Sequence, residues 1–239
     1  MSDTSLRDSC LKRFLHYVTF DTQSDENSET YPSTAKQLVL LKHLLAELKS
    51  IGLKDATMDE HGYVFATIPA TSKKSKVPVV GFIAHVDTSP EMPGVDVKPI
   101  VHKNYKGQDL VLPDDPKPVL TFKDNPHLAD QIGCDIVTAS GATLLGADNK
   151  SGVAEIVAAA EYLMKHPEIR TETSVSASPP TKRSETAPST STSRNSAPRA
   201  PTPWTARPAA RSRWKPGPPT RSRSASKGTT PIPATRRGR

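Results

Sequence analysis

The composition of this 239-residue chain changes abruptly near residue 170, and the change limits what the chain can fold into. Residues 1–170 hold 18 basic and 23 acidic side chains, whereas residues 171–239 hold 14 basic and 2 acidic ones. The last 69 residues also contain 12 Pro and 24 Ser or Thr, with no Leu and no Phe. Such a segment cannot bury enough apolar surface to offset the entropy lost on ordering. We therefore expect a folded part over 1–170 and a disordered tail over 171–239.

The cysteines and the apolar runs limit which cellular compartment and which class of protein the sequence fits. Cys10 and Cys134 are far apart in sequence and neither lies in a Cys-x-x-Cys motif, which argues against a disulfide framework or a cysteine zinc site. No apolar run reaches the roughly 20 residues that span a membrane. The first residues lack the basic and then apolar pattern of a signal peptide. The sequence predicts a soluble cytoplasmic protein with no membrane partner.

Apolar spacing in residues 1–170 predicts an α/β fold, in which a sheet is flanked by helices. A first helix is indicated by four apolar residues at helical spacing, Leu11, Phe14, Leu15 and Val18. A second helix is expected to start at residues 32–34. Strand patterns cover residues 64–68 and 77–84, and the nearly continuous apolar run of the latter is typical of a strand buried on both faces. A further helix is expected to begin at Asp148.

The first motif with chemical potential is His85-Val86-Asp87, which directly follows the strand at 77–84. Side chains two residues apart on a strand point to the same side, and ligands of open α/β sheets collect at this edge. An imidazole beside a carboxylate can bind a metal while the carboxylate fixes its tautomer. A strand-end histidine followed by a helix-capping aspartate explains so short a pattern equally well.

The second motif is the string from Leu144 to Glu155, in which Asp148 stands where a strand gives way to a helix. A carboxylate there has two oxygens and could bridge two metal ions about 3.5–4 Å apart, as in binuclear hydrolases. An ordinary helix N-cap is the commoner explanation for an Asp in this position. The two motifs together, each at the end of a strand, make a stronger case than either alone.

These strings resemble a known family. The chain is similar to the zinc exopeptidases that include acetylornithine deacetylase and succinyl-diaminopimelate desuccinylase, and most of all to their tripeptide-cleaving aminopeptidases. The resemblance runs from about residue 11 to residue 170, less than half of a usual family member. It rests on strings at residues 12–18, 21–24, 32–34, 81–90, 104–105 and 144–155.

The resemblance implies a role for each candidate residue. His85 would be a ligand of one zinc ion, Asp87 the catalytic-site carboxylate that orients His85, and Asp148 the bridge between two zinc ions. The Asp148–Asn149 peptide bond would be cis. The implied fold is part of a zinc-exopeptidase catalytic domain, and the implied activity is release of the N-terminal residue from tripeptides.

The rest of the family's pattern has no counterpart here. The family needs a Glu-Glu pair, one further Asp ligand and a distant His ligand, whereas residues 171–239 contain no Asp, no His and no Glu-Glu. The family's small lid or dimerisation domain is also absent. A catalytic zinc takes about three protein ligands and a water. We therefore expect this chain to hold zinc weakly and to be inactive.

A shifted reading frame accounts for the tail. Residues 179–187 can be encoded by CCC CCG ACG AAG AGA TCG GAA ACG GCG. With one A added in front, the same bases read Thr-Pro-Asp-Glu-Glu-Ile-Gly-Asn-Gly, which contains the missing Glu-Glu. Residues 202–206 and 171–175 similarly yield Thr-Val-Asp-Gly and His-Gly-Asp-Ile-Arg. The sequence thus predicts that one base was lost near the Arg170 codon and that 171–239 is out of frame.

Two alternatives remain at this stage. One is another member of the same family, such as a deacylase, because the substrate-reading residues lie outside 1–170. The other is a nucleic-acid-binding protein whose basic arm, with 11 Arg in residues 171–239 and with Trp204 and Trp214 for stacking, contacts phosphates. The shifted frame explains the Arg excess without selection for binding, so nucleic acid is not the expected partner.

Overall fold

The computed structural model describes residues 3–72, 78–114, 119–121, 123–171 and 174–178. The chain divides into two compact units, residues 1–192 and 193–239, and everything described lies in the first. The basic segment that would form a nucleic-acid-binding arm, and the tail expected to be disordered, lie almost wholly outside the described residues. In the described part, no helix is long and apolar enough to cross a membrane.

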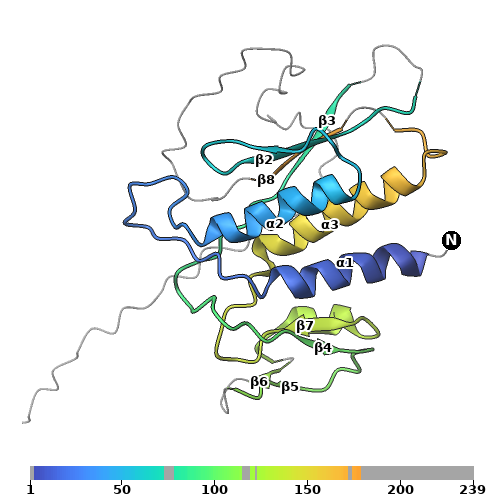
Figure 1. Ribbon diagram of the computed structural model, residues 1–239. Coiled ribbons are helices and arrows are strands. Elements are labelled where there is room, and N and C mark those ends of the chain that lie inside the picture. Colours follow the sequence, from blue (N-terminus) through green and yellow to red (C-terminus); the bar gives the residue numbers. More distant parts are fainter. Residues whose placement is uncertain (1–2, 73–77, 115–118, 122, 172–173, 179–239) are drawn as a thin grey trace, which may run out of the picture. The chain divides into compact units, whose positions relative to one another are not determined.

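The first unit is built from a mixed sheet with helices on one face, which confirms the predicted α/β class (Figure 1). In the described part the sheet has the strand order β1-β2-β8-β3. Strand β8 pairs antiparallel with β2 and parallel with β3. These four strands are β1 (Thr57–Met58), β2 (Val64–Ile68), β3 (Val80–Ile83) and β8 (Ser174–Ser178).

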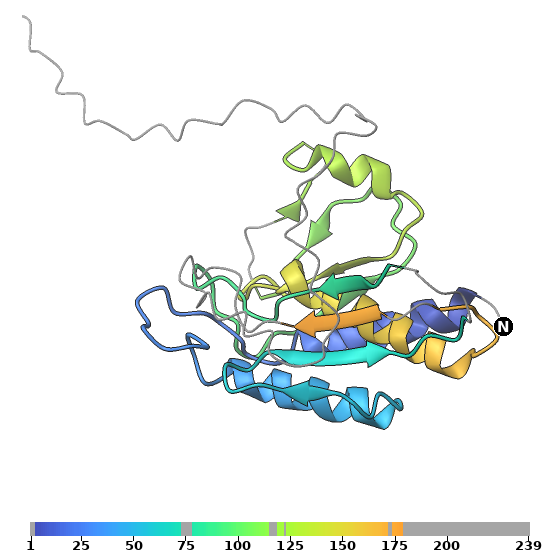
Figure 2. The ribbon, with the colours of Figure 1, turned by 90° about the horizontal axis from the view of Figure 1, so that it is seen from above.

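Three helices of the described part form the core with the sheet. They are α1 (Asp3–Tyr17), α2 (Gln37–Ser50) and α3 (Ala147–Lys165). Helices α2 and α3 pack against the sheet, and α1 packs against α3, as Figures 1 and 2 show. On β2, Val64, Ala66 and Ile68 are buried toward the helices, where they meet a cluster that includes Leu40, Leu41, Leu44, Val153 and Val157.

An excursion between β3 and α3 forms two small antiparallel pairs beside α1 (Figure 1). Strand β4 (Ile100–His102) pairs with β7 (Ile136–Thr138), and β5 (Leu110–Val111) pairs with β6 (Val119–Leu120). A short 3₁₀ helix, Pro126–Gln131, precedes β7. The excursion is therefore made of short strands and one short helix.

The second helix starts later than the sequence predicts. A start at residues 32–34 was expected from Pro32, but α2 begins at Gln37. The backbone N–H of Gln37 donates to the carbonyl of Thr34, and Thr34 Oγ1 donates to the carbonyl of Gln23 at 2.8 Å. Residues 32–34 therefore form a turn fastened to the preceding loop rather than the first helical turn.

Strand β3 is not buried on both faces, although its apolar run is typical of such a strand. Among the described strands β3 is at the edge of the sheet, next to β8 alone. Its side chains are exposed, with Val80 at 49 %, Phe82 at 49 % and Ile83 at 71 %. An apolar run shows that a strand prefers burial, but it cannot show which element covers it.

The ordered part also extends beyond residue 170. Composition predicts a tail that begins at residue 171, whereas Ser174–Ser178 forms β8 between β2 and β3. Thr71 N and Ser72 N donate to the carbonyl of Thr171 just before this strand. Backbone pairing explains the difference, because a central strand position satisfies the N–H and C=O groups of any non-proline residue.

Arg13 links the three helices. From α1 its Nε lies 2.7 Å from Glu47 Oε1 on α2, and its Nη1 lies 2.8 Å from Glu161 Oε2 on α3. Tyr17 donates to the other oxygen of Glu47. Hydrogen bonds from Lys165 and then Arg13 outweigh burial and lower the pKa of Glu161 from 4.5 to about 2. The link is therefore intact at neutral pH, and its contribution to stability falls only as the pH drops from about 4.5 toward 2.

Replacing Arg13 with Met tests this link. The change removes the cation that Glu47 and Glu161 share and leaves Glu161 with Lys165 as its ion-pair partner, so we expect the free energy of unfolding in urea to fall by about 2 kcal/mol. Arg7→Met is the matched control, because Arg7 pairs with Asp135 at the surface and is 65 % exposed. Its loss should cost less than about 0.5 kcal/mol. Equal losses in the two variants would contradict the assignment.

The exposed apolar edge predicts self-association. A flat edge strand with free backbone groups and apolar side chains is an aggregation site, and a lysine placed on it opposes pairing. We expect Ile83→Lys to lower light scattering and binding of a hydrophobic dye several-fold at the same protein concentration. Val39→Lys is the control, because Val39 is also exposed, at 57 %, but lies on helix α2. The prediction is wrong if both changes have the same effect.

Candidate metal centre

The three side chains singled out by the motifs meet at one place. His85 Nδ1 lies 2.9 Å from Asp87 Oδ1, and His85 Nε2 lies 3.0 Å from Asp148 Oδ1. The side chains differ in exposure: His85 is 12 % exposed, Asp87 4 % and Asp148 73 %. A buried carboxylate therefore holds one side of the imidazole, and a solvent-facing carboxylate stands at the other.

These residues lie at the ends of two secondary-structure elements. His85 and Asp87 follow the end of β3, and Asp148 lies in the first turn of α3. Asp148 and Asn149 have non-helical backbone angles, so the regular helix begins after them. The peptide bond between them is cis, as the family resemblance implies. A cavity of about 380 Å³ opens over His85, Asp87 and Asp148 and is otherwise lined by Ser89 and residues 144–147.

The loop before α2 fastens the segment that carries His85 and Asp87. Thr22 Oγ1 donates to the carbonyl of Val86 at 2.7 Å, and Thr88 N donates to the carbonyl of Thr22 at 3.2 Å. Ser24 donates to the carbonyl of Thr88 from both its N–H and its hydroxyl, each at 3.0 Å. Thr22 and Thr88 are buried. This paired segment fixes the backbone on both sides of Asp87.

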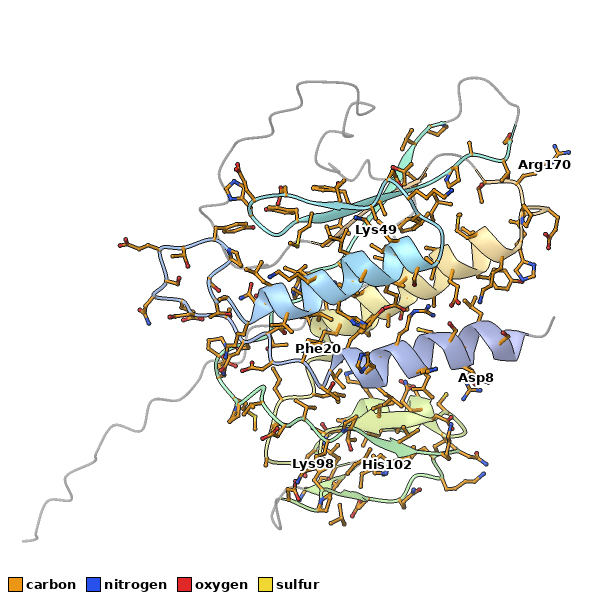
Figure 3. The ribbon with its side chains drawn as sticks, viewed as in Figure 1. Asp8, Phe20, Lys49, Lys98, His102 and Arg170 are labelled. Carbon is orange, nitrogen blue, oxygen red and sulfur yellow. The ribbon has the colours of Figure 1, made fainter. Side chains whose placement is uncertain are left out.

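A buried lysine fastens the other half of the site. Lys150, on α3, is 2 % exposed, and its Nζ donates to the carbonyl of Phe20 at 2.7 Å. Phe20 lies just past the C-terminal end of α1 (Figure 3). Burial lowers the pKa of Lys150 to about 8, against the opposing charge of Asp21. Lys150 belongs to the second motif, but its role could not be inferred from the sequence, because the carbonyl that it binds lies on a distant loop.

Gly146 allows the two halves to approach. Its φ is +76°, a conformation that favours glycine. A Cβ at this position would lie 3.0 Å from Thr88 Cγ2 and 3.6 Å from Lys150 Nζ. The glycine therefore lets the start of α3 lie close against the segment that carries Asp87.

The geometry calls for a positive charge between His85 and Asp148. Burial by itself lowers the pKa of His85, but the hydrogen bonds and charges of Asp87 and Asp148 outweigh it and raise that pKa. If Nδ1–H donates to Asp87, then Nε2 presents a lone pair toward Asp148. Two acceptors 3.0 Å apart are favourable only with a proton or a cation between them.

The donor atoms of these residues are of the type that binds zinc, but there are too few of them for a catalytic site. Imidazole nitrogen and carboxylate oxygen are ordinary zinc ligands, but a catalytic zinc takes about three of them from the protein. In the part of the chain that the structure describes, no group of three or more His, Cys, Asp or Glu is placed to hold a metal ion. The described residues therefore supply fewer ligands than a catalytic zinc takes, and they do not by themselves define a reaction step through zinc.

Comparisons with known proteins identify relatives of this chain. The chain is 52 % identical to "Peptidase T" of Alkaliphilus oremlandii over 161 residues, which cover 67 % of this chain and 39 % of that protein. It is 54 % identical to "Peptidase T" of Clostridium acetobutylicum over 160 residues, again 67 % of this chain and 39 % of that protein. The chain thus spans about two-fifths of the length of these relatives. No protein-family model matches it.

Among solved structures, the chain resembles the aminopeptidase PepT of Bacillus cereus at 21 % identity. That match covers 72 % of this chain and 36 % of the other, with a TM-score of 0.47. The fold and the site define an α/β protein in which an imidazole and two carboxylates converge beside the end of β3 and the start of α3. Over two-thirds of its length the chain is a homologue of peptidase T, and the resemblance inferred from the motifs is confirmed.

Replacing Thr22 with Val tests the segment that positions Asp87. Valine matches the shape of threonine but cannot donate to the carbonyl of Val86, which is left buried and unpaired. We expect the free energy of unfolding to fall by about 1–3 kcal/mol. Thr19→Val is the control, because the Thr19 hydroxyl donates to the carbonyl of His16 at an exposed position. A cost for Thr22→Val no larger than for Thr19→Val would contradict the assignment.

Proposed function

We propose that residues 1–170 are the N-terminal part of the catalytic domain of a zinc-dependent aminopeptidase that releases the N-terminal residue from tripeptides. The observation that carries the proposal is the identity of about one half to proteins named peptidase T over two-thirds of the chain. The convergence of His85, Asp87 and Asp148 supports it. A location in the cytoplasm is part of the same proposal.

Each of the three residues has a role in this proposal. Asp87 accepts a hydrogen bond from Nδ1–H of His85 and so holds the ring with Nε2 toward the cavity. His85 would be a ligand of one zinc ion, and the exposed carboxylate of Asp148 would be a ligand shared by the zinc pair. Bound zinc would polarise the peptide carbonyl of the substrate. Asp87 therefore acts through His85 and is a positioning residue.

The chain by itself should not catalyse the reaction. Two ligands and one positioning carboxylate leave both zinc ions short of the three protein ligands that catalytic zinc takes. Residues 171–239 contain no Asp, no His and no Glu-Glu that could complete the set. We therefore propose that the active protein needs the part of its relatives that this chain does not match.

The first experiment tests the isolated chain. With zinc added, we expect no release of amino acid from Ala-Ala-Ala above the rate of a His85→Ala variant. Equilibrium dialysis should show no tightly held zinc, because affinity depends on completing the ligand set. Turnover that His85→Ala removes, or one zinc held tightly by each chain, would show that the centre is complete after all.

The second experiment tests the proposed function itself. Residues 1–170 are fused to the C-terminal remainder of the peptidase T of Clostridium acetobutylicum, the 54 % identical relative. We expect the folded fusion to hydrolyse Ala-Ala-Ala when zinc is supplied. His85→Ala and Asp148→Ala should each lower kcat/KM by at least about 10³-fold, whereas His127→Ala, at an exposed position outside the site, should not.

The folding of the fusion is measured separately, so that a loss of activity cannot be mistaken for a failure to fold. A monomeric fusion that melts cooperatively and binds zinc, yet cleaves no tripeptide, would overturn the proposed substrate. A fusion that instead hydrolyses N-acylated amino acids would support a deacylase of the same family. A gene sequence with an intact frame around the Arg170 codon would overturn the proposed frame change, and this result is independent of the activity.

A further inference from the structure

The fold brings together two cysteines that sequence spacing keeps apart. Cys10, on α1, and Cys134, which follows the short 3₁₀ helix, line the same cavity of about 540 Å³. Phe14, Val137 and Glu155 also line it. The cavity lies between α1, α3 and the segment that leads into β7, on different residues from those around His85. The proposed peptidase function uses neither thiol.

Specific contacts hold both walls of this cavity. Arg7 is one helical turn before Cys10 on α1, and its Nη2 lies 2.7 Å from Oδ2 of Asp135, the neighbour of Cys134. Residues one turn apart share a helix face, so Arg7 and Cys10 point toward the same wall. Tyr105 N donates to the carbonyl of Cys134 at 2.8 Å, and Gly133 N donates to the carbonyl of Tyr105 at 2.7 Å. One ion pair and two backbone hydrogen bonds therefore hold the segments that carry the two cysteines.

The two thiols differ in accessibility. Cys134 is exposed, whereas Cys10 is partly buried. Burial, together with the charge of Glu155, raises the pKa of the Cys10 thiol against the opposing charge of Arg13. A dissolved oxidant therefore meets Cys134 first, and Cys10 lies in the cavity wall as a second thiol.

We propose that Cys10 and Cys134 form a thiol pair that a peroxide oxidises reversibly to an intramolecular disulfide. A disulfide requires the two Cα atoms to lie within roughly 7 Å, so the proposal requires the two walls to approach that closely at Cys10 and Cys134. The bond would tie α1 to the segment before β7, where the Arg7–Asp135 ion pair already joins them. The proposal is independent of the peptidase function.

The chemistry balances in two steps. The Cys134 thiolate attacks hydrogen peroxide, so that an S–O bond forms, the O–O bond breaks and one water leaves, giving a sulfenic acid. The Cys10 sulfur then attacks Cys134 Sγ, so that the S–S bond forms, the S–O bond breaks and a second water leaves. Two thiols lose two electrons, and the peroxide is reduced to two waters.

The test uses the full 239-residue chain at low concentration. After treatment with a small excess of hydrogen peroxide, we expect Ellman's reagent to count no free thiols, and dithiothreitol to restore both. Mass spectrometry of a non-reduced tryptic digest should show the peptide of Cys10 joined to that of Cys134. In Cys10→Ser, and in Cys10→Ala as a second variant, dimedone should instead trap a sulfenic acid on Cys134.

A second experiment tests whether the Arg7–Asp135 ion pair positions the two cysteines. Arg7→Ala removes the ion pair that joins the two walls, and we expect it to slow bridging several-fold while the far-ultraviolet spectrum stays unchanged. The bridging rate of the unaltered chain should not depend on protein concentration. Oxidation of either thiol without bridging, a disulfide found only between chains, or unchanged thiols would each overturn the proposal.

Discussion

One buried ammonium group joins the segments on which the candidate site depends. Lys150 Nζ leaves α3 and donates to the carbonyl of Phe20, which fixes the start of α3 to the loop that follows α1. A buried charge is costly unless it is hydrogen bonded, so this contact constrains both segments. The same loop then pairs, through Thr22, with the residues on either side of Asp87. The distance between His85 and Asp148 follows from these long-range contacts.

The sequence predicted which side chains lie together in the candidate site better than it predicted the residues that hold them in place. His85 and Asp87 were identifiable because alternation along a strand puts residues two apart on one side. Asp148 was identifiable from its place where a strand gives way to a helix. Thr22 and Lys150 could not be assigned, because their partners are backbone carbonyls far along the chain, and no local pattern marks a carbonyl as an acceptor.

The errors in the predicted fold have a similar cause. The apolar run at residues 77–84 shows that β3 favours burial, but covering depends on other elements, and in the described part β3 has β8 on one side only. The boundary at residue 170 failed for the opposite reason. Composition measures what side chains gain from burial, whereas Ser174–Ser178 is placed by backbone pairing with β2 and β3.

On the proposed function, the further zinc ligands and the cover for the sheet edge would come from the same part of the protein. The ligands that the family resemblance requires would come after Arg170, and so would elements that could cover Val80, Phe82 and Ile83. What the described residues do supply is orientation. His85 is held by a carboxylate that is only 4 % exposed, before any metal or substrate binds. A fixed imidazole loses little freedom when further ligands arrive, so completing the set needs donors at the right distance rather than rearrangement of this half.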